Sequence, residues 1–118
     1  MNRPNLPRGR AGLHALHLAV QVATSLAQLS LERGLAHLRD HLVRAGDNTV
    51  LRLSEASGRT LANRHQHLEA AYAKNQEVQS DLVLIRSRGI EIPVAVVAQA
   101  DRLGGLIYGL LRAELARR

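Results

Sequence analysis

Residues 49–88 read TVLRLSEASGRTLANRHQHLEAAYAKNQEVQSDLVLIRSR, a stretch of forty residues without proline. One set of positions in it is separated by four and three residues in strict alternation. These positions hold Val50, Ser54, Ser57, Leu61, Arg64, Leu68, Ala71, Asn75, Val78, Leu82 and Ile85. The alternation is the heptad pattern of a coiled-coil seam. It predicts one helix over 49–88 that packs against another helix along this seam.

The predicted seam contains polar residues, among them Arg64 and Asn75. Polar seam residues lower the stability of a coiled coil but fix its register and oligomeric state. We therefore predict that the seam joins copies of this chain. The predicted oligomer seam consists of Leu61, Arg64, Leu68, Asn75, Val78 and Leu82.

Two further helices are predicted on either side of this stretch. Upstream, residues 11–45 lack proline, and their apolar side chains recur at steps of three and four, as Leu16, Val20, Ala23, Ala27, Leu31, Leu35, Leu38 and Leu42. Gly46 can end this helix and Asp47 or Asn48 can start the next, so we expect the chain to reverse at 46–48. Downstream, Gly89 is placed to end the helix over 49–88, and Pro93 suits the first turn of a third helix over 93–116.

Together these segments predict an all-α fold. We expect residues 11–118 to form a single helical domain, in which an elongated antiparallel hairpin of two long coiled-coil-like helices carries a shorter third helix, as in a three-helix bundle. Helices of this length would extend ~50–60 Å, so the third helix could not cover both. A second copy of the chain would cover the remaining apolar surface, which predicts a homo-oligomer. The core must consist of Leu, Val, Ile and Ala, because the chain has no Phe or Trp and only two Tyr.

The formal net charge of +6 is unevenly distributed along the sequence. Arg3, Arg8 and Arg10 supply half of it within residues 1–10, where two prolines and a glycine disfavour a helix. We therefore predict a flexible basic arm over 1–10, of the kind that contacts nucleic-acid phosphates. Arg86 and Arg88, at a predicted helix end, are the second candidates for binding DNA or RNA.

Other classes of site find little support in the sequence. Without cysteine there is no disulfide or thiolate chemistry, and there is no phosphate-binding glycine loop or nucleophile elbow, so we predict neither an enzyme nor a cofactor. His37 and His41 have the i, i+4 spacing of a metal-binding pair. Arg33 and Arg44 share their helical face and would repel a cation, so no metal site is predicted there.

Residues 11–31 form a charge-free stretch of bilayer-spanning length. Five polar side chains nevertheless follow one face of the predicted helix, namely His14, His17, Gln21, Thr24 and Gln28. Two imidazoles and two amides in hydrocarbon would be costly, so we interpret the stretch as an amphipathic helix with an uncharged polar face, outside any membrane.

The sequence leaves two functional hypotheses. The first is a cytoplasmic helical interaction protein, an oligomeric scaffold or adaptor that binds its own copies or another helical protein. The alternative is a small nucleic-acid-binding accessory or regulatory protein that contacts phosphates through the N-terminal arm. A helix-turn-helix around Gly89 is not supported, because Val94, Val96 and Val97 at the start of the second helix cannot read bases.

Overall fold

A computed structural model describes residues 6–58 and 61–117. The described chain contains four α-helices and one short 3-10 helix, and it contains no strand. In chain order, the elements are α1 (Leu6–Ala27), η2 (Arg33–Leu35), α2 (Ala36–Gly58), α3 (Leu61–Ser87) and α4 (Val94–Ala116). The all-α prediction is confirmed, but the predicted three-helix arrangement is wrong, because the chain forms four helices.

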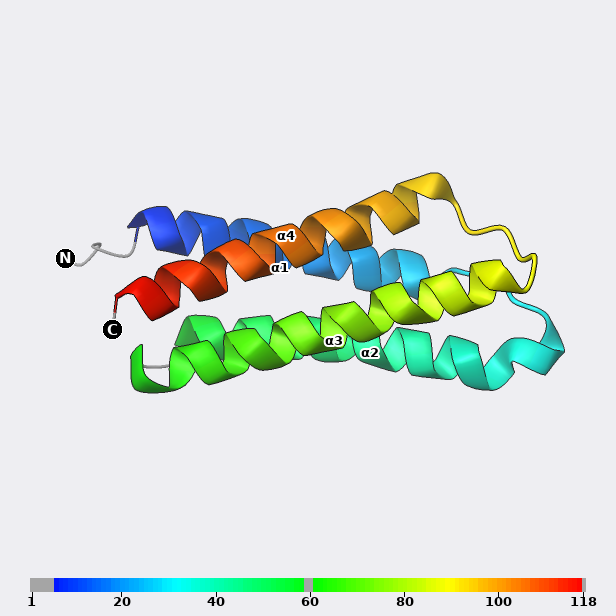
Figure 1. Cartoon of the computed structure of the whole chain (residues 1–118), viewed down its shortest axis with the longest axis horizontal. Helices are drawn as coiled ribbons and strands as arrows, with labels where there is room; N and C mark the ends of the chain where they lie inside the picture. The colour runs from blue at the N-terminus through cyan, green and yellow to red at the C-terminus, as the bar shows by residue number, and fades with distance from the viewer. Residues whose placement is uncertain (1–5, 59–60, 118) are drawn as a thin grey trace.

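The four helices run alternately up and down as a bundle (Figure 1). Each helix packs against two others, in the cyclic order α1, α2, α3, α4. The molecule measures 51 × 21 × 19 Å, which confirms its elongated shape. We call the end where α1 and α3 begin and α2 and α4 end the terminal end, and the opposite end the loop end. The alternating directions bring both termini of the chain to the terminal end (Figure 1).

The helix predicted over 11–45 divides in two. α1 ends at Ala27, and the chain turns through 28–35 before α2 begins. The Arg39 guanidinium of α2 reaches back over this turn: Nε donates to the Leu29 carbonyl at 3.0 Å and Nη2 to the Ala27 carbonyl at 2.6 Å. Ala27 is the last residue of α1, where a carbonyl has no intrahelical donor, so Arg39 caps the helix from a distance. The apolar period runs through the turn, since Leu29 and Leu31 pack on the core, and it therefore predicted an unbroken helix.

The turn predicted at 46–48 does not exist, because α2 continues through it. Gly46 is buried against α1. A Cβ atom there would lie 2.8 Å from Leu26 Cδ1 and 3.6 Å from Ala23 Cα. The glycine thus allows α1 and α2 to approach closely, and it does not end a helix.

The helix predicted over 49–88 is also divided, since α2 ends at Gly58 and α3 begins at Leu61. Arg64 of α3 donates from Nε to the Ala56 carbonyl at 3.1 Å, so the end of α2 is also capped by an arginine of the following helix. The buried stripe of α2 differs from the predicted seam and consists of Leu38, Leu42, Ala45, Gly46, Thr49, Leu53 and Ala56. Ser54 and Ser57 of the predicted seam are exposed.

The predicted connection between the second and third predicted helices agrees with the turn between α3 and α4. Gly89 follows α3 with a φ of 83°, a left-handed conformation that favours glycine, and Pro93 directly precedes α4.

The arm predicted over 1–10 is partly helical, since α1 begins at Leu6. Pro7 lies in the first turn, where its missing N–H has no intrahelical acceptor. Residues 1–5, including Arg3, lie outside the described residues.

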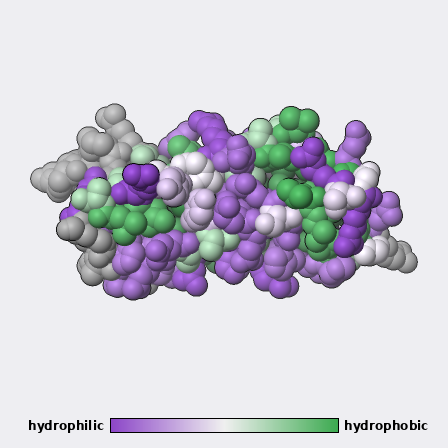
Figure 2. Space-filling model, viewed as in Figure 1, coloured by the Kyte–Doolittle hydropathy of each residue, from purple (hydrophilic) through white to green (hydrophobic). Residues whose placement is uncertain are grey.

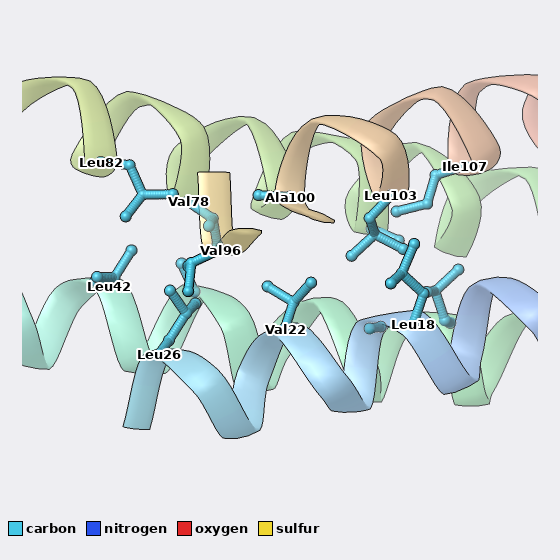
Figure 3. Packing of buried hydrophobic residues seen from close by; sticks show 14 of the residues in the cluster. Leu18, Val22, Leu26, Leu42, Val78, Leu82, Val96, Ala100, Leu103 and Ile107 are labelled. Atoms are coloured by element: carbon cyan, nitrogen blue, oxygen red, sulfur yellow. The ribbon is translucent and has the colours of Figure 1, made fainter. Parts of the chain in front are cut away.

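The core is aliphatic and is shared by all four helices. Figure 3 shows that side chains of α1 and α2 point toward those of α3 and α4. The labelled side chains are Leu18, Val22 and Leu26 of α1, Leu42 of α2, Val78 and Leu82 of α3, and Val96, Ala100, Leu103 and Ile107 of α4. One chain therefore buries a continuous core without a partner.

Candidate functional site

The residues predicted to form an oligomer seam lie in the core of a single chain. Leu68, Asn75, Val78 and Leu82 are buried. They are covered by the helices that flank α3 in the same chain, so they are not available to a second copy, and their assignment to an oligomer seam is wrong. Arg64 is largely buried and bonds within the chain. Leu61 is the first residue of α3, and its side chain lies outside the described part of the structure.

Asn75 has a register-fixing role, but between helices of one chain. Its Nδ2 donates to the Ala100 carbonyl of α4 at 3.0 Å, and Nε2 of Gln79 donates to the same oxygen at 3.1 Å. Asn75 is fully buried, and its Oδ1 atom has no hydrogen-bond partner. Gly104 lies next to both amides and leaves them room. The two amides therefore fix how α3 and α4 align.

A buried ion pair joins α3 and α4 near the terminal end. Arg64 Nη1 lies 3.7 Å from Oε1 of Glu114, and the Glu114 side chain is fully buried. Separating such a pair is costly, because each charge would remain in a medium of low dielectric constant. The pair accounts for two charged residues at core positions of α3 and α4.

His41 joins α2 to α3 through two carboxylates. Its Nδ1 lies 2.5 Å from Asp81 Oδ2 and its Nε2 lies 3.7 Å from Glu77 Oε1. A histidine held by an aspartate can act as a general base when a hydroxyl or thiol lies beside it. The shallow pocket here, about 470 Å³, is lined by His37, Leu38, Asp40, His41, Arg44 and Asp81. This lining contains no such nucleophile, so the arrangement supports helix packing. Residues 6–58 and 61–117 contain no group of three side chains that could hold a metal ion.

The residues predicted to bind nucleic acid are not brought together. Arg8 and Arg10 belong to the first turns of α1, at the terminal end, although the structure does not describe their side chains. Arg86 and Arg88 lie where α3 ends, at the loop end. A bundle 51 Å long separates the two groups. They cannot form one compact phosphate-binding site.

The outer face of α1 is exposed and carries no charge. We define this outer face as Leu13, His17, Val20, Gln21, Thr24 and Gln28, all of which are exposed. Leu13 and Val20 retain 54% and 46% of their accessible surface. Val20 and Thr24 continue into a groove of about 670 Å³ between α1 and α2, whose far side includes the exposed Leu51 and the exposed Asp47. The charge-free stretch 11–31 was the signal of this face in the sequence.

A second groove, of about 310 Å³, lies between α3 and α4 at the loop end. Val83 and Val94 line it and are 65% and 83% exposed. Figure 2 shows the corresponding hydrophobic surface over this part of the bundle. Arg86 and Asp101 line the same groove, so it combines apolar and charged side chains as an ordinary protein surface does.

By length and composition, α4 is apolar enough to cross a membrane. In the bundle, a stripe of α4 faces the core, consisting of Val96, Ala100, Leu103, Gly104, Ile107, Leu110 and Glu114. Its exposed residues include Asp101, Arg102 and Arg112. Core helices commonly have such a composition, so this single helix is weak evidence for a membrane span.

No family model matches the chain, and neither a curated protein nor a solved structure matches it at a significant level. Its function must therefore be inferred from its own surfaces.

Proposed function

We propose that this chain is a helical interaction protein that self-associates through the outer face of α1 and displays the rest of the bundle as a scaffold or adaptor. The observation that carries the proposal is an exposed helix face without a charge over residues 11–31. No catalytic function is proposed.

The composition of this face sets it apart from the rest of the surface. Charged residues make up 22% of the chain, so about five would be expected among 21 residues. Solvated surfaces usually contain a larger fraction of charged residues than the chain as a whole. Leu13 and Val20 lie seven residues apart, two turns along one side of α1, and Thr24 continues this side by one further turn. A partner helix could bury both side chains along one line.

A second copy of the chain is the occupant that this face fits best. The six residues of the outer face carry no charge that would attract an acidic or a basic partner, and the adjoining groove adds a single charged residue, Asp47 of α2. A twofold axis would place it against an identical uncharged face. His17, Gln21, Thr24 and Gln28 can both donate and accept hydrogen bonds, so their polar atoms can pair across such an axis. The interface would then bury apolar side chains without stranding polar ones.

The test measures the molar mass of the intact protein by size-exclusion chromatography with light scattering at two concentrations. Wild type is expected to be a dimer or larger at micromolar concentration. Val20→Glu places a charge in the proposed interface, and each copy would contribute one across the axis, so this variant is expected to be monomeric. Val83→Glu, an apolar-to-charged change at an exposed site on α3, is the matched control and should remain oligomeric.

A monomeric wild type would overturn the proposal. So would the reverse pattern, in which Val83→Glu dissociates the protein and Val20→Glu does not, because it would assign the interface to the groove between α3 and α4. Circular dichroism of both variants establishes that they remain helical. If wild type is monomeric but a different helical protein binds it and Val20→Glu abolishes that binding, self-association is wrong and the partner is a heterologous helix.

A further inference from the structure

The fold gathers the excess positive charge at the terminal end. Three described segments meet there: residues 6–10 at the start of α1, residues 52–58 and 61–69 where α2 ends and α3 begins, and residues 112–117 at the end of α4. These segments contain six basic and three acidic residues, and two of the basic residues form the ion pairs Arg52–Glu55 and Arg64–Glu114. The other described residues hold seven of each sign and are neutral overall. Arg3, Arg59 and Arg118 lie outside the described residues.

The chain has two tyrosines and neither Phe nor Trp. The two tyrosine rings contact each other in the half of the bundle nearer the terminal end. The rings of Tyr72 in α3 and Tyr108 in α4 lie 5.8 Å apart between centroids, inclined at 46°. Tyr108 is 47% exposed. One turn further along α4, the Arg112 guanidinium lies 5.8 Å from the centre of the Tyr108 ring. Tyr72 supports the ring and the Arg112 guanidinium lies over it, while about half of Tyr108 faces solvent.

The helix surface next to Tyr108 lacks a side chain at two exposed positions. Gly105 and Gly109 lie on the same exposed face of α4, and a Cβ atom at either would have nothing within 4 Å. Neither glycine is needed for helix packing, although each destabilises a helix relative to alanine. The consequence is that a flat group can approach the tyrosine over a bare stretch of helix.

We propose that the terminal end binds single-stranded nucleic acid, with one base stacked on Tyr108 and the backbone held by arginines. Arg112 and the exposed Arg117 continue along α4 from the ring, and Arg8 and Arg10 start the neighbouring α1. An aromatic ring beside a positively charged surface is the combination with which proteins bind single strands without reading sequence. A duplex would offer no free base to the ring, so an unpaired strand is the ligand that uses both features.

This inference stands apart from the proposed self-association. It rests on the terminal ends of α1 and α4 and on Tyr108, whereas self-association rests on the midsection of α1. Each proposal can fail without the other, because Val20→Glu leaves the terminal end unchanged.

The test is fluorescence polarisation of the intact protein with labelled 20-nucleotide oligo-dT and oligo-U, and with a 20-base-pair duplex, at 50 and 200 mM salt. We expect both single strands to bind more tightly than the duplex, and binding to weaken as salt is raised. Comparing the two strands shows whether DNA or RNA is the better ligand. Because the chain has no Trp, tyrosine fluorescence reports stacking directly. In Tyr72→Phe, Tyr108 is the only tyrosine, and its emission should be quenched by the strand.

Variants separate the stacking contribution from the charge contribution. Tyr108→Ala should weaken binding about 5- to 150-fold, the range found for losing one stacked base, whereas Tyr108→Phe should bind within about twofold of wild type. Arg112→Ala should reduce the slope of log affinity against log salt by about 0.7, the value for one phosphate contact on a single strand. Arg86→Ala, at the loop end, is the matched control and should change neither quantity.

Three results would overturn the inference: no binding of either single strand at 50 mM salt, tighter binding of the duplex, or equal affinity of Tyr108→Ala and wild type. Weakening by Arg86→Ala as large as that by Arg112→Ala would also overturn it, because the site would then not lie at the terminal end. Circular dichroism spectra of the variants ensure that lost binding is not lost folding.

Discussion

The same substitution at two adjacent glycines of α4 should change the free energy of unfolding in opposite directions. Gly104 faces α3, where a Cβ atom would lie 2.8 Å from Gln79 Nε2 and 3.1 Å from Asn75 Nδ2. At Gly105 a Cβ atom would meet nothing within 4 Å. We predict that Gly104→Ala destabilises the protein and that Gly105→Ala stabilises it.

The magnitudes follow from two opposing contributions. Alanine is favoured over glycine inside a helix by about 1 kcal/mol, and this gain applies at both positions. At Gly104 the new methyl group displaces amides that donate to the Ala100 carbonyl, and loss of a buried hydrogen bond with an amide left unpaired costs about 1–3 kcal/mol. Gln79 is partly exposed and can move aside, but Asn75 is fully buried and has little freedom to move. We therefore expect Gly104→Ala to lose up to about 2 kcal/mol net and Gly105→Ala to gain about 1 kcal/mol.

The assay is urea denaturation followed by circular dichroism at one fixed protein concentration. The midpoint should fall for Gly104→Ala and rise for Gly105→Ala, while the denaturant dependence stays the same, since neither change alters the surface exposed on unfolding. If both midpoints rise by similar amounts, Gly104 is not required for the packing of α3 on α4, and the reasoning from its two amide neighbours is refuted.

Two arginines provide the remaining predictions. Arg39→Ala should lower the unfolding free energy by about 1–2 kcal/mol, because the carbonyls of Ala27 and Leu29 lose their donor; limited proteolysis should then cut faster in this turn, and an unchanged cutting rate would contradict the capping role. Arg64→Met should cost about 3–5 kcal/mol in thermal or urea denaturation, because Glu114 remains buried without its arginine; adding Glu114→Gln should recover part of the loss, and strict additivity would show that the two charges are not coupled.

The sequence pattern predicted the helical elements better than their ends. Heptad spacing correctly identified the buried side of α3 from Leu68 onward, and Gly89 and Pro93 marked the turn into α4, because a glycine at positive φ and a proline before a helix are local requirements. The turn after α1 was missed because the apolar period continues through it. The turn after α2 was missed because the four-three spacing was continued through Ser54 and Ser57, which are polar and exposed. What stabilises those turns is an arginine from the following helix, a tertiary contact that no local pattern reveals.

Gly46 shows how a local signal can mislead in the other direction. A glycine followed by Asp47 and Asn48 resembles a helix end and a new start. In the fold, Gly46 is the point of closest approach between α1 and α2, opposite Leu26. A glycine can allow either a turn or a close contact between two helices. Which of the two it allows depends on whether another helix packs against it.

The number of helices also decides where the charge lies. A chain of three alternating helices would place its two termini at opposite ends, so the arginines of residues 1–10 and those of residues 112–118 would be separated. Four alternating helices return the C-terminus to the N-terminus (Figure 1), and the turn between α2 and α3 falls at the same end. Counting charge along the sequence therefore identified the arginine-rich N-terminus. It could not show that the end of α4 lies beside this segment, or that Tyr108 lies near both. The positively charged terminal end depends on the topology. A circular permutant that joins the native termini and opens the turn between α3 and α4, at the loop end, should therefore preserve it. Removing α1 should not.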